Sequence, residues 1–282
     1  YCSFQKKDSI VVPYNTIKLA KEARALGVRE GYYVVGERPD RFAHIRSTLD
    51  LWGFNSYLDY LYTVCELGFL EGLIPVLEAG FLVPEELKKL REIVAVLKIN
   101  MDSVDSVHEE KIYSNSPGKK KELRMKVLEW AGKLKFPTAT GIMVGIGETK
   151  SHRKEMLNWI ASVHQKYGTI HEVSIQNFVP QPKTKFSDKV KPSKDQVLET
   201  VEMALSILPK DVSVTVPLEY NSNLEEFVKA GVRDFGRVLE GSRGVVSENI
   251  PVITEDDLAA RVEKLGFRIQ QRFPLKKNFI KN

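Results

Sequence analysis

The stretch that decides the fold is residues 138–149, with the sequence TATGIMVGIGET. Its first part, residues 138–144, is a largely apolar run that predicts a buried strand. Gly145 and Gly147 then predict a tight turn, and a helix is expected over 154–167. A second strand is expected over 172–176. A strand, a helix and a second strand with short connections form a parallel βαβ unit.

The same alternation continues on both sides of this unit. Further strands are expected over 32–35, 73–77, 94–99 and 212–216. Helices are expected over 15–26, 57–70, 123–134, 194–208 and 223–230, with another that begins at 84. Repeated βα units predict an α/β fold, a partial or near-complete parallel (β/α) barrel, whose first strand is expected upstream of Cys2. A doubly wound open sheet is the alternative, because periodicity alone does not fix the order of the strands.

Composition limits the class of protein. The chain of 282 residues is 43% hydrophobic and 28% charged, which excludes a disordered or fibrous protein, and no linker-like stretch interrupts it, so residues 1–282 are expected to form a single domain. Two cysteines cannot make a disulfide scaffold, which favours a reduced, cytoplasmic protein. The chain starts at Tyr1 rather than at a methionine, so it is expected to be part of a longer protein.

Neither a membrane nor a nucleic acid is an expected partner. No apolar run approaches the roughly 18 residues that a membrane span requires. The formal net charge is only +5, and the basic runs at 119–121 and 276–277 lack the interleaved aromatic residues that bind single strands. A small-molecule ligand is therefore the more natural expectation.

Glycines and polar residues follow the ends of the expected strands. They are Gly36-Glu37, Glu78, Asn100 to Asp102, Gly145 to Glu148, and Gln176-Asn177. In parallel α/β sheets these loops carry the chemistry, because glycine turns expose backbone N–H groups and carboxylates bind hydroxyl or ammonium groups. The alternative is that the glycines only turn the chain and the acids only complement helix dipoles. The agreement of five loops favours a binding rim.

Common catalytic templates are absent. Gly141, Gly145 and Gly147 lack the spacing of a dinucleotide fingerprint, and the histidines lack the spacing of a zinc site. Cys65 lies between apolar positions of an expected helix and is predicted to be in the core. Cys2 is expected at the rim, with a buried structural role as its alternative.

Tyr1-Cys2, Gly36-Glu37 and residues 141–148 together resemble the radical S-adenosylmethionine superfamily. That superfamily carries a Cys-x3-Cys-x2-Cys loop after its first barrel strand, with an aromatic residue before the third cysteine. The resemblance makes Cys2 a metal ligand of a 4Fe-4S cluster, with two further cysteines expected upstream of residue 1. It implies that the cluster and S-adenosyl-L-methionine are the cofactors.

Within the superfamily, the chain resembles the FO synthase family of the CofG type along nearly its whole length. The matching segments are 1–4, 35–40, 115–119, 131–134, 140–149 and 176–182. The resemblance implies a radical enzyme that forms the deazaflavin FO, the precursor of coenzyme F420, from a 4-hydroxybenzyl-dihydrouracil adduct. Ammonia, methionine and 5′-deoxyadenosine would be released. It also implies an electron donor such as ferredoxin or flavodoxin, and allows a partner FO synthase subunit.

The resemblance also implies roles for individual residues. Glu37 would bind the methionine amino group, Arg124 the methionine carboxylate, and Asp102 the ribose, where the family usually has a longer Glu. The remaining positions expected at S-adenosylmethionine or the substrate ring are Gly36, Gly145, Gly147, Glu148, Gln176 and Asn177. For Arg124 the alternative is an ordinary exposed helix residue.

Two segments, 217–220 and 234–239, depart from the family pattern, and Arg237 stands where the family has a glycine. Both lie in the half that sets substrate identity, and residues 237–282 are interpreted as a C-terminal extension on the substrate side. The alternatives are a sister radical enzyme, either a tyrosine-transferring CofH-like subunit or a menaquinone-pathway relative, and a non-catalytic barrel without the cluster.

Overall fold

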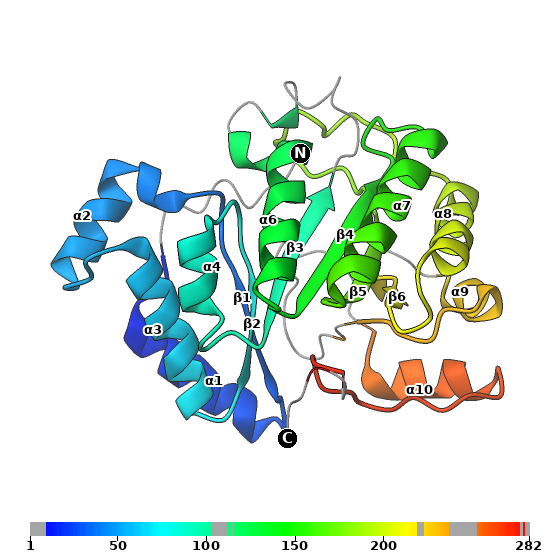
Figure 1. The fold of residues 1–282 in the computed structure, drawn as a ribbon. Coiled ribbons are helices and arrows are strands. Elements are labelled where there is room, and N and C mark those ends of the chain that lie inside the picture. The colour runs from blue at the N-terminus through cyan, green and yellow to red at the C-terminus, as the bar shows by residue number, and fades with distance from the viewer. Residues whose placement is uncertain are drawn as a thin grey trace.

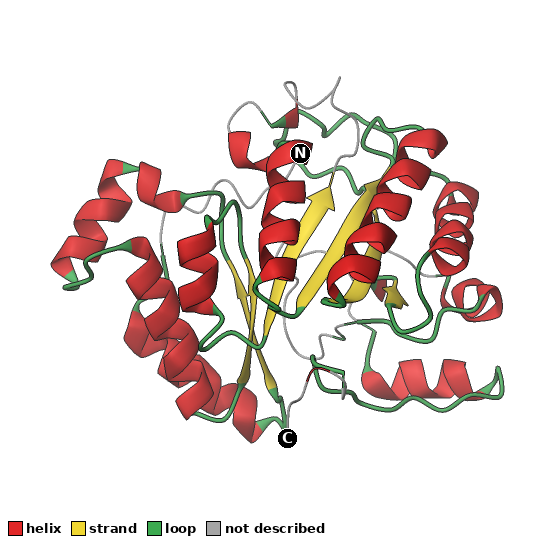
Figure 2. Cartoon of the chain, in the orientation of Figure 1, coloured by secondary structure: helices red, strands yellow, loops and turns green. Residues whose placement is uncertain are grey.

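The computed structural model describes residues 10–102, 112–113, 116–218, 223–236, 238, 253–276 and 279. Its centre is a parallel sheet of six strands, paired in chain order from β1 to β6 (Figures 1 and 2). The strands are β1 (Glu30–Val34), β2 (Ile74–Glu78), β3 (Val96–Asp102), β4 (Thr138–Val144), β5 (Ile170–Asn177) and β6 (Ser213–Thr215). Since no pairing among the described residues joins β6 to β1, the sheet is open.

Helices follow the strands and pack against one face of the sheet (Figure 1). The α-helices are α1 (Pro13–Ala25), α2 (Ala43–Leu51), α3 (Tyr57–Leu70), α4 (Pro84–Leu90), α6 (Lys121–Lys133), α7 (Lys150–Tyr167), α8 (Lys194–Ile207), α9 (Leu224–Ala230) and α10 (Glu255–Glu263). Two 3₁₀ turns, η2 (Pro39–Arg41) and η3 (Pro117–Lys119), lie in the connections after β1 and β3. Within the described residues, no helix is long and apolar enough to cross a membrane.

Strand β4 shows why the apolar run of residues 138–144 forms the middle of the sheet. Every residue of β4 is buried, and β3 and β5 pair with it on either side. The strand runs through Gly145 into α7, where the Thr149 hydroxyl accepts a hydrogen bond from the backbone N–H of His152 and caps the helix. The sequence TATGIMVGIGET is therefore a complete strand, turn and helix cap.

The two faces of the sheet differ in chemistry. Alternate residues such as Leu77, Leu97 and Ile142 enter a large apolar core beneath the helices. The opposite face, which we call the inner face, carries a small apolar cluster of Val76, Val96 and Ala139, against which Leu275 of the C-terminal segment packs, and Met143 from a second small cluster. The other inner-face positions are mostly polar, unlike the packed interior of an ordinary barrel. Their side chains come from Tyr32, Glu78, Lys98, Asn100, Glu172, Ser174, Gln176 and Thr215.

The C-terminal segment joins the inner face through an arginine. Arg272 binds Glu172 of β5 at 2.7 Å and Asp234 at 2.8 Å. Burial alone would raise the pKa of Glu172, but Lys98 and Arg272 together hold it below its usual range. The described part of the predicted extension 237–282 is therefore tied to β5, and its substrate-side role stays a prediction.

The structure confirms the α/β class and the parallel βα alternation. Of the partial and the near-complete barrel that the sequence left open, the described strands fit the partial one, because they form an open sheet. The doubly wound alternative is wrong, since that fold requires the strand order to reverse, whereas here neighbours in sequence are neighbours in the sheet. Cys65 lies in the core, as expected. Cys2, Arg237 and residues 219–220 lie outside the described residues.

Candidate functional site

Glu37 lies in the loop after β1, and both of its carboxylate oxygens are engaged. Oε1 accepts a hydrogen bond from the backbone N–H of Phe81 at 3.0 Å. Oε2 accepts one from the Arg124 guanidinium at 3.3 Å. The Glu37 side chain is only 5% exposed. The Glu37 carboxylate is therefore buried at the rim, although it belongs to a loop.

Two glycines make room for the Glu37 carboxylate. A Cβ atom added to Gly80 would lie 2.6 Å from Oε2, and one added to Gly118 would lie 2.0 Å from Oε1. Both distances are too short for any other residue type without a rearrangement. Gly80 follows β2 and Gly118 belongs to η3, so segments far apart in sequence form this cradle.

Arg124 reaches the same cradle from α6. One terminal nitrogen donates to the carbonyl of Ala79 at 3.0 Å, and the other binds Glu37. The side chain is 6% exposed, and its Nε has no partner among the described residues. The sequence alternative, an exposed helix arginine, is wrong. Glu37 and Arg124 form a buried ion pair with one donor still unused.

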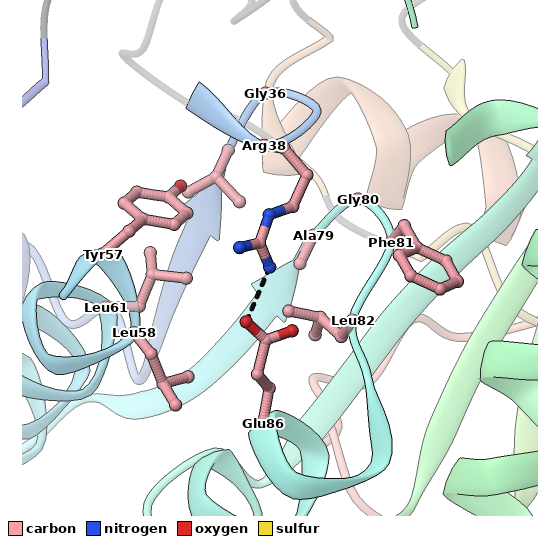
Figure 3. Close-up of a pocket in the computed structure, with 11 residues that line it drawn as sticks. Gly36, Arg38, Tyr57, Leu58, Leu61, Ala79, Gly80, Phe81, Leu82 and Glu86 are labelled. Atoms are coloured by element: carbon pink, nitrogen blue, oxygen red, sulfur yellow. Dashed lines mark hydrogen bonds and ion pairs between the residues drawn. The ribbon is translucent and has the colours of Figure 1, made fainter. Parts of the chain in front are cut away.

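The loop beyond Gly36 is anchored separately. Arg38 adopts a left-handed backbone conformation with φ of 44°. Its guanidinium binds Glu86 of α4 at 2.6 Å and Asp40 at 2.7 Å. Figure 3 shows Arg38 crossing a small, mainly apolar pocket that Gly36 also lines. This ion pair fixes the loop that carries Glu37.

Asp102 ends β3 in an unusual backbone conformation. Its φ is 50°, and the pairing of β3 with β4 shifts register between Asn100 and Asp102. The Asp102 carboxylate binds Lys119 at 2.8 Å. Burial alone would lower the pKa of Lys119, but the adjacent Asp102 carboxylate raises it above its usual range. Contact of Asp102 with a ribose stays a prediction.

The Glu148 side chain is wholly buried and shapes the glycine turn after β4. Its carboxylate accepts hydrogen bonds from the backbone N–H groups of Gly145 and Ile146, each at 2.9 Å, and from Arg153 at 2.8 Å. Gly145 and Gly147 have φ values of 93° and 124°, which favour glycine. Glu148 thus holds the backbone of the turn, while its expected contact with adenosine or substrate stays a prediction.

Gln176 and Asn177 end β5 beside the end of β4. They pair with Met143 and Val144, so both reach the same rim as the glycine turn. Gln176 is half-buried on the inner face, whereas Asn177 is 5% exposed. The structure gives neither of them a contact with Glu37 or Arg124.

The metal ligand expected from the sequence, Cys2, lies outside the described residues. Within those residues there is no group of three His, Cys, Asp or Glu side chains that could hold a metal ion. Cys65 is fully buried, and burial raises the pKa of its thiol to about 12. A thiol in this environment is not a candidate cluster ligand.

The cradle of Glu37 and Arg124 fits the amino-acid end of S-adenosylmethionine. That end carries an ammonium and a carboxylate, and the cradle offers one carboxylate and one guanidinium at the carboxyl ends of the strands. The unused Nε of Arg124 is a donor that a carboxylate would satisfy. The residues present therefore suit this cofactor.

Sequence reasoning missed the partners that position these groups. In the sequence, Lys119 belongs only to the matching segment 115–119 and to a basic run, yet in the structure it binds Asp102. Arg153 lies five residues after Glu148, where the first turn of α7 brings it back to the carboxylate. A basic residue one helical turn after a strand-end acid is the signal that could have revealed it.

Comparisons with known proteins give the relatives of this chain. Residues 1–160 match the model of the radical SAM superfamily. The 7,8-didemethyl-8-hydroxy-5-deazariboflavin synthase of Methanothermobacter thermautotrophicus is 34% identical, and the alignment covers 99% of this chain and 87% of that protein. The synthase of the same name from Archaeoglobus fulgidus is 32% identical, with coverage of 100% and 86%.

Solved structures show the same fold at low sequence identity. The FeFe-hydrogenase maturase HydG from Carboxydothermus hydrogenoformans is 16% identical, with a TM-score of 0.72, over 92% of this chain and 59% of its own. The methylornithine synthase PylB is 15% identical, with a TM-score of 0.71, over 96% of this chain and 78% of its own.

Proposed function

The chain belongs to the radical S-adenosylmethionine superfamily and, within it, to the 7,8-didemethyl-8-hydroxy-5-deazariboflavin synthases, and we propose that it completes the deazaflavin ring of FO. It is an enzyme of the radical S-adenosylmethionine synthase type. The proposed substrate is a 4-hydroxybenzyl-dihydrouracil adduct. Ring closure releases ammonia, and the cofactor leaves as methionine and 5′-deoxyadenosine.

A 4Fe-4S cluster and S-adenosylmethionine, when bound, supply a carbon radical that removes a hydrogen atom from the substrate. Cys2 and two upstream cysteines would hold the cluster, and an external protein such as ferredoxin or flavodoxin would supply the electron. Glu37 would bind the methionine ammonium, and Arg124 would bind the methionine carboxylate with the Nε that is unused in this structure.

The remaining residues of the rim would orient the rest of the cofactor and the substrate. Glu148 would act through the backbone, because its carboxylate is already occupied by Gly145, Ile146 and Arg153. Asp102 would meet a ribose hydroxyl from its left-handed position at the end of β3. Gln176 would face the substrate from the inner face.

The observation that carries the proposal is the buried ion pair of Glu37 and Arg124 in its glycine cradle. Two buried charges cost several kcal/mol to desolvate, so a fold that only needs stability gains little from them. At the carboxyl ends of parallel strands, the same charges match a zwitterionic ligand. The family relationship supports S-adenosylmethionine as that ligand.

The test is product formation by the full-length protein with a reconstituted cluster, S-adenosylmethionine and a reductant. With the adduct, we expect 5′-deoxyadenosine, ammonia and FO in equal amounts. Release of 5′-deoxyadenosine with tyrosine but not with the adduct would identify the tyrosine-using sister enzyme instead. Absence of release with a loaded cluster would refute the enzymatic proposal, whereas failure of the full-length protein to load a cluster would leave the non-catalytic barrel.

Substitutions in the cradle test whether Glu37 and Arg124 bind S-adenosylmethionine. Glu37→Gln and Arg124→Met should each weaken S-adenosylmethionine binding about tenfold or more in equilibrium titrations, because each leaves a buried charge unpaired. Glu122→Gln and Arg91→Met remove the same charges from exposed positions and serve as matched controls. Equal affinities in all four variants would refute the cradle assignment.

A further inference from the structure

Three polar side chains from neighbouring strands form a hydrogen-bonded cluster on the inner face. The Tyr32 hydroxyl donates to Oε2 of Glu78 at 2.6 Å. The Asn100 side-chain N–H donates to Oε1 of Glu78 at 2.9 Å. All three residues are half-buried, so none is sealed within the core. The proposed function has not used any of them.

The hydrogen bond to Glu78 fixes the orientation of the Asn100 amide. A carboxylate oxygen accepts, so the amide nitrogen must face Glu78 and the amide oxygen must face away. That oxygen, Oδ1, is buried and has no partner among the described residues. An unpaired buried acceptor is unfavourable, and a purely structural cluster has no reason to retain one.

A glycine faces the unpaired oxygen. Gly141 pairs with Asn100 across β3 and β4, and a Cβ atom on Gly141 would lie 3.0 Å from Oδ1. A side chain here would crowd the oxygen, and it would also meet the backbone carbonyl of Ser174 at 2.6 Å. Because position 141 is a glycine, no side chain there contacts the buried acceptor.

A donor lies on the same strand. Lys98 precedes Asn100 by two residues, so both side chains stand on the inner face about 7 Å apart along β3. The Lys98 ammonium lies 5.8 Å from the centre of the Tyr32 ring and lowers the pKa of Glu172. Strand β3 therefore presents a donor, an acceptor and, beside them, the face of an aromatic ring.

We propose that Lys98, Asn100 and the Tyr32–Glu78 pair form a subsite for a cyclic imide or ureide, a ring in which N–H and C=O groups alternate. Oδ1 of Asn100 accepts from a ring N–H, and Lys98 donates to a ring carbonyl. Glu78 and Tyr32 fix the Asn100 amide in the accepting orientation. The inference rests on the proposed function for its ligand, because the pyrimidinedione ring of the deazaflavin and the reduced ring of its precursor belong to this class.

The experiment measures equilibrium binding of FO and of its N3-methyl derivative to the full-length protein. The methyl group removes the ring N–H. We expect the wild-type protein to bind FO roughly tenfold more tightly than the derivative, as one lost hydrogen bond to a buried acceptor predicts. Asn100→Leu has nearly the same size but no acceptor, so it should bind both ligands within about twofold of each other.

Controls separate recognition from folding. Asn158→Leu changes an exposed asparagine on α7 and should retain the tenfold preference. Lys98→Met should weaken both ligands equally, because it removes the donor to the carbonyl and leaves Asn100 in place; it also tests the subsite should Asn100→Leu fail to fold. Undiminished preference in Asn100→Leu, or unchanged affinity in Lys98→Met, overturns the inference.

The outcomes also distinguish the inference from the proposed function. Asn100-dependent preference in a protein that makes no FO from the adduct would support the subsite and reject the reaction. Formation of FO by a protein whose preference does not depend on Asn100 would support the reaction and reject the subsite. Failure of the wild-type protein to distinguish FO from its N3-methyl derivative rejects the subsite.

Discussion

The contact between Gly68 of α3 and Tyr33 of β1 can be tested by mutation. Strand β1 leads to Glu37, so this contact bears on the position of the candidate site. A Cβ atom on Gly68 would lie 1.7 Å from the Tyr33 hydroxyl oxygen and 3.1 Å from the ring carbon that bears it. The hydroxyl is buried without a partner among the described residues, and burial raises its pKa far above the usual range. Gly68→Ala should therefore force Tyr33 and β1 to shift.

The magnitude follows from two opposed effects. Overpacking of this severity costs about 3 kcal/mol, and alanine gains about 1 kcal/mol over glycine within a helix. Gly68→Ala should therefore lower the free energy of unfolding by about 2 kcal/mol. Tyr33→Phe should be nearly neutral, because it removes a hydroxyl that makes no hydrogen bond in the described part of the chain.

The double variant of Gly68→Ala and Tyr33→Phe tests whether contact with the Tyr33 hydroxyl causes the loss of stability. Without the hydroxyl, the nearest ring atom is at 3.1 Å, so Tyr33→Phe should restore most of the stability lost in Gly68→Ala. Urea unfolding followed by circular dichroism gives the four free energies, and we expect a coupling of about 2 kcal/mol. Additive effects of the two substitutions would refute the contact as the cause.

Three further perturbations address the rest of the fold. Glu148→Gln should cost about 3 kcal/mol in urea unfolding, because it leaves the buried Arg153 guanidinium with only the more distant, part-exposed Glu199 carboxylate at 3.7 Å as a charged partner; a loss below 1 kcal/mol would contradict this. Arg272→Met should lower the thermal midpoint by several degrees, since it leaves Glu172 without its arginine, and an unchanged midpoint would argue against the link. Burial lowers the pKa of His171 to about 4, so the unfolded chain binds the proton more readily and stability should fall from pH 6.5 towards pH 4. His171→Leu should remove that pH dependence, and identical profiles would disprove the assignment.

Strands such as β4 could be predicted because they are largely apolar runs whose residues are buried. The run 138–144 coincides with β4, and the helix expected over 57–70 coincides with α3. The helices α2 and α10 were not predicted, because their apolar positions are few and polar residues occupy most of each helix. Strand order and closure could not be predicted either, since periodicity describes each element alone and not which edges meet.

For the candidate site, the sequence predicted that Glu37, Asp102 and Glu148 lie at the ends of strands, but not which groups they contact. The rule that loops follow the carboxyl ends of parallel strands located Glu37, Asp102 and Glu148. It could not show that Glu37 is already paired with Arg124. It also could not show that the Glu148 carboxylate accepts hydrogen bonds from the backbone of its own turn. Such partners depend on side-chain direction in three dimensions, which the spacing of residues along the chain does not contain.

The pairing of Glu37 with Arg124 has a consequence for selectivity. The cradle is electrically neutral before any ligand arrives, and it stays neutral when a zwitterion inserts between the two side chains. A molecule carrying only one of the two charges, such as the decarboxylated form of the sulfonium cofactor, would leave the guanidinium stranded in a dry environment. If the cradle binds S-adenosylmethionine as proposed, discrimination against such analogues would follow from an exchange of ion pairs between Glu37, Arg124 and the ligand.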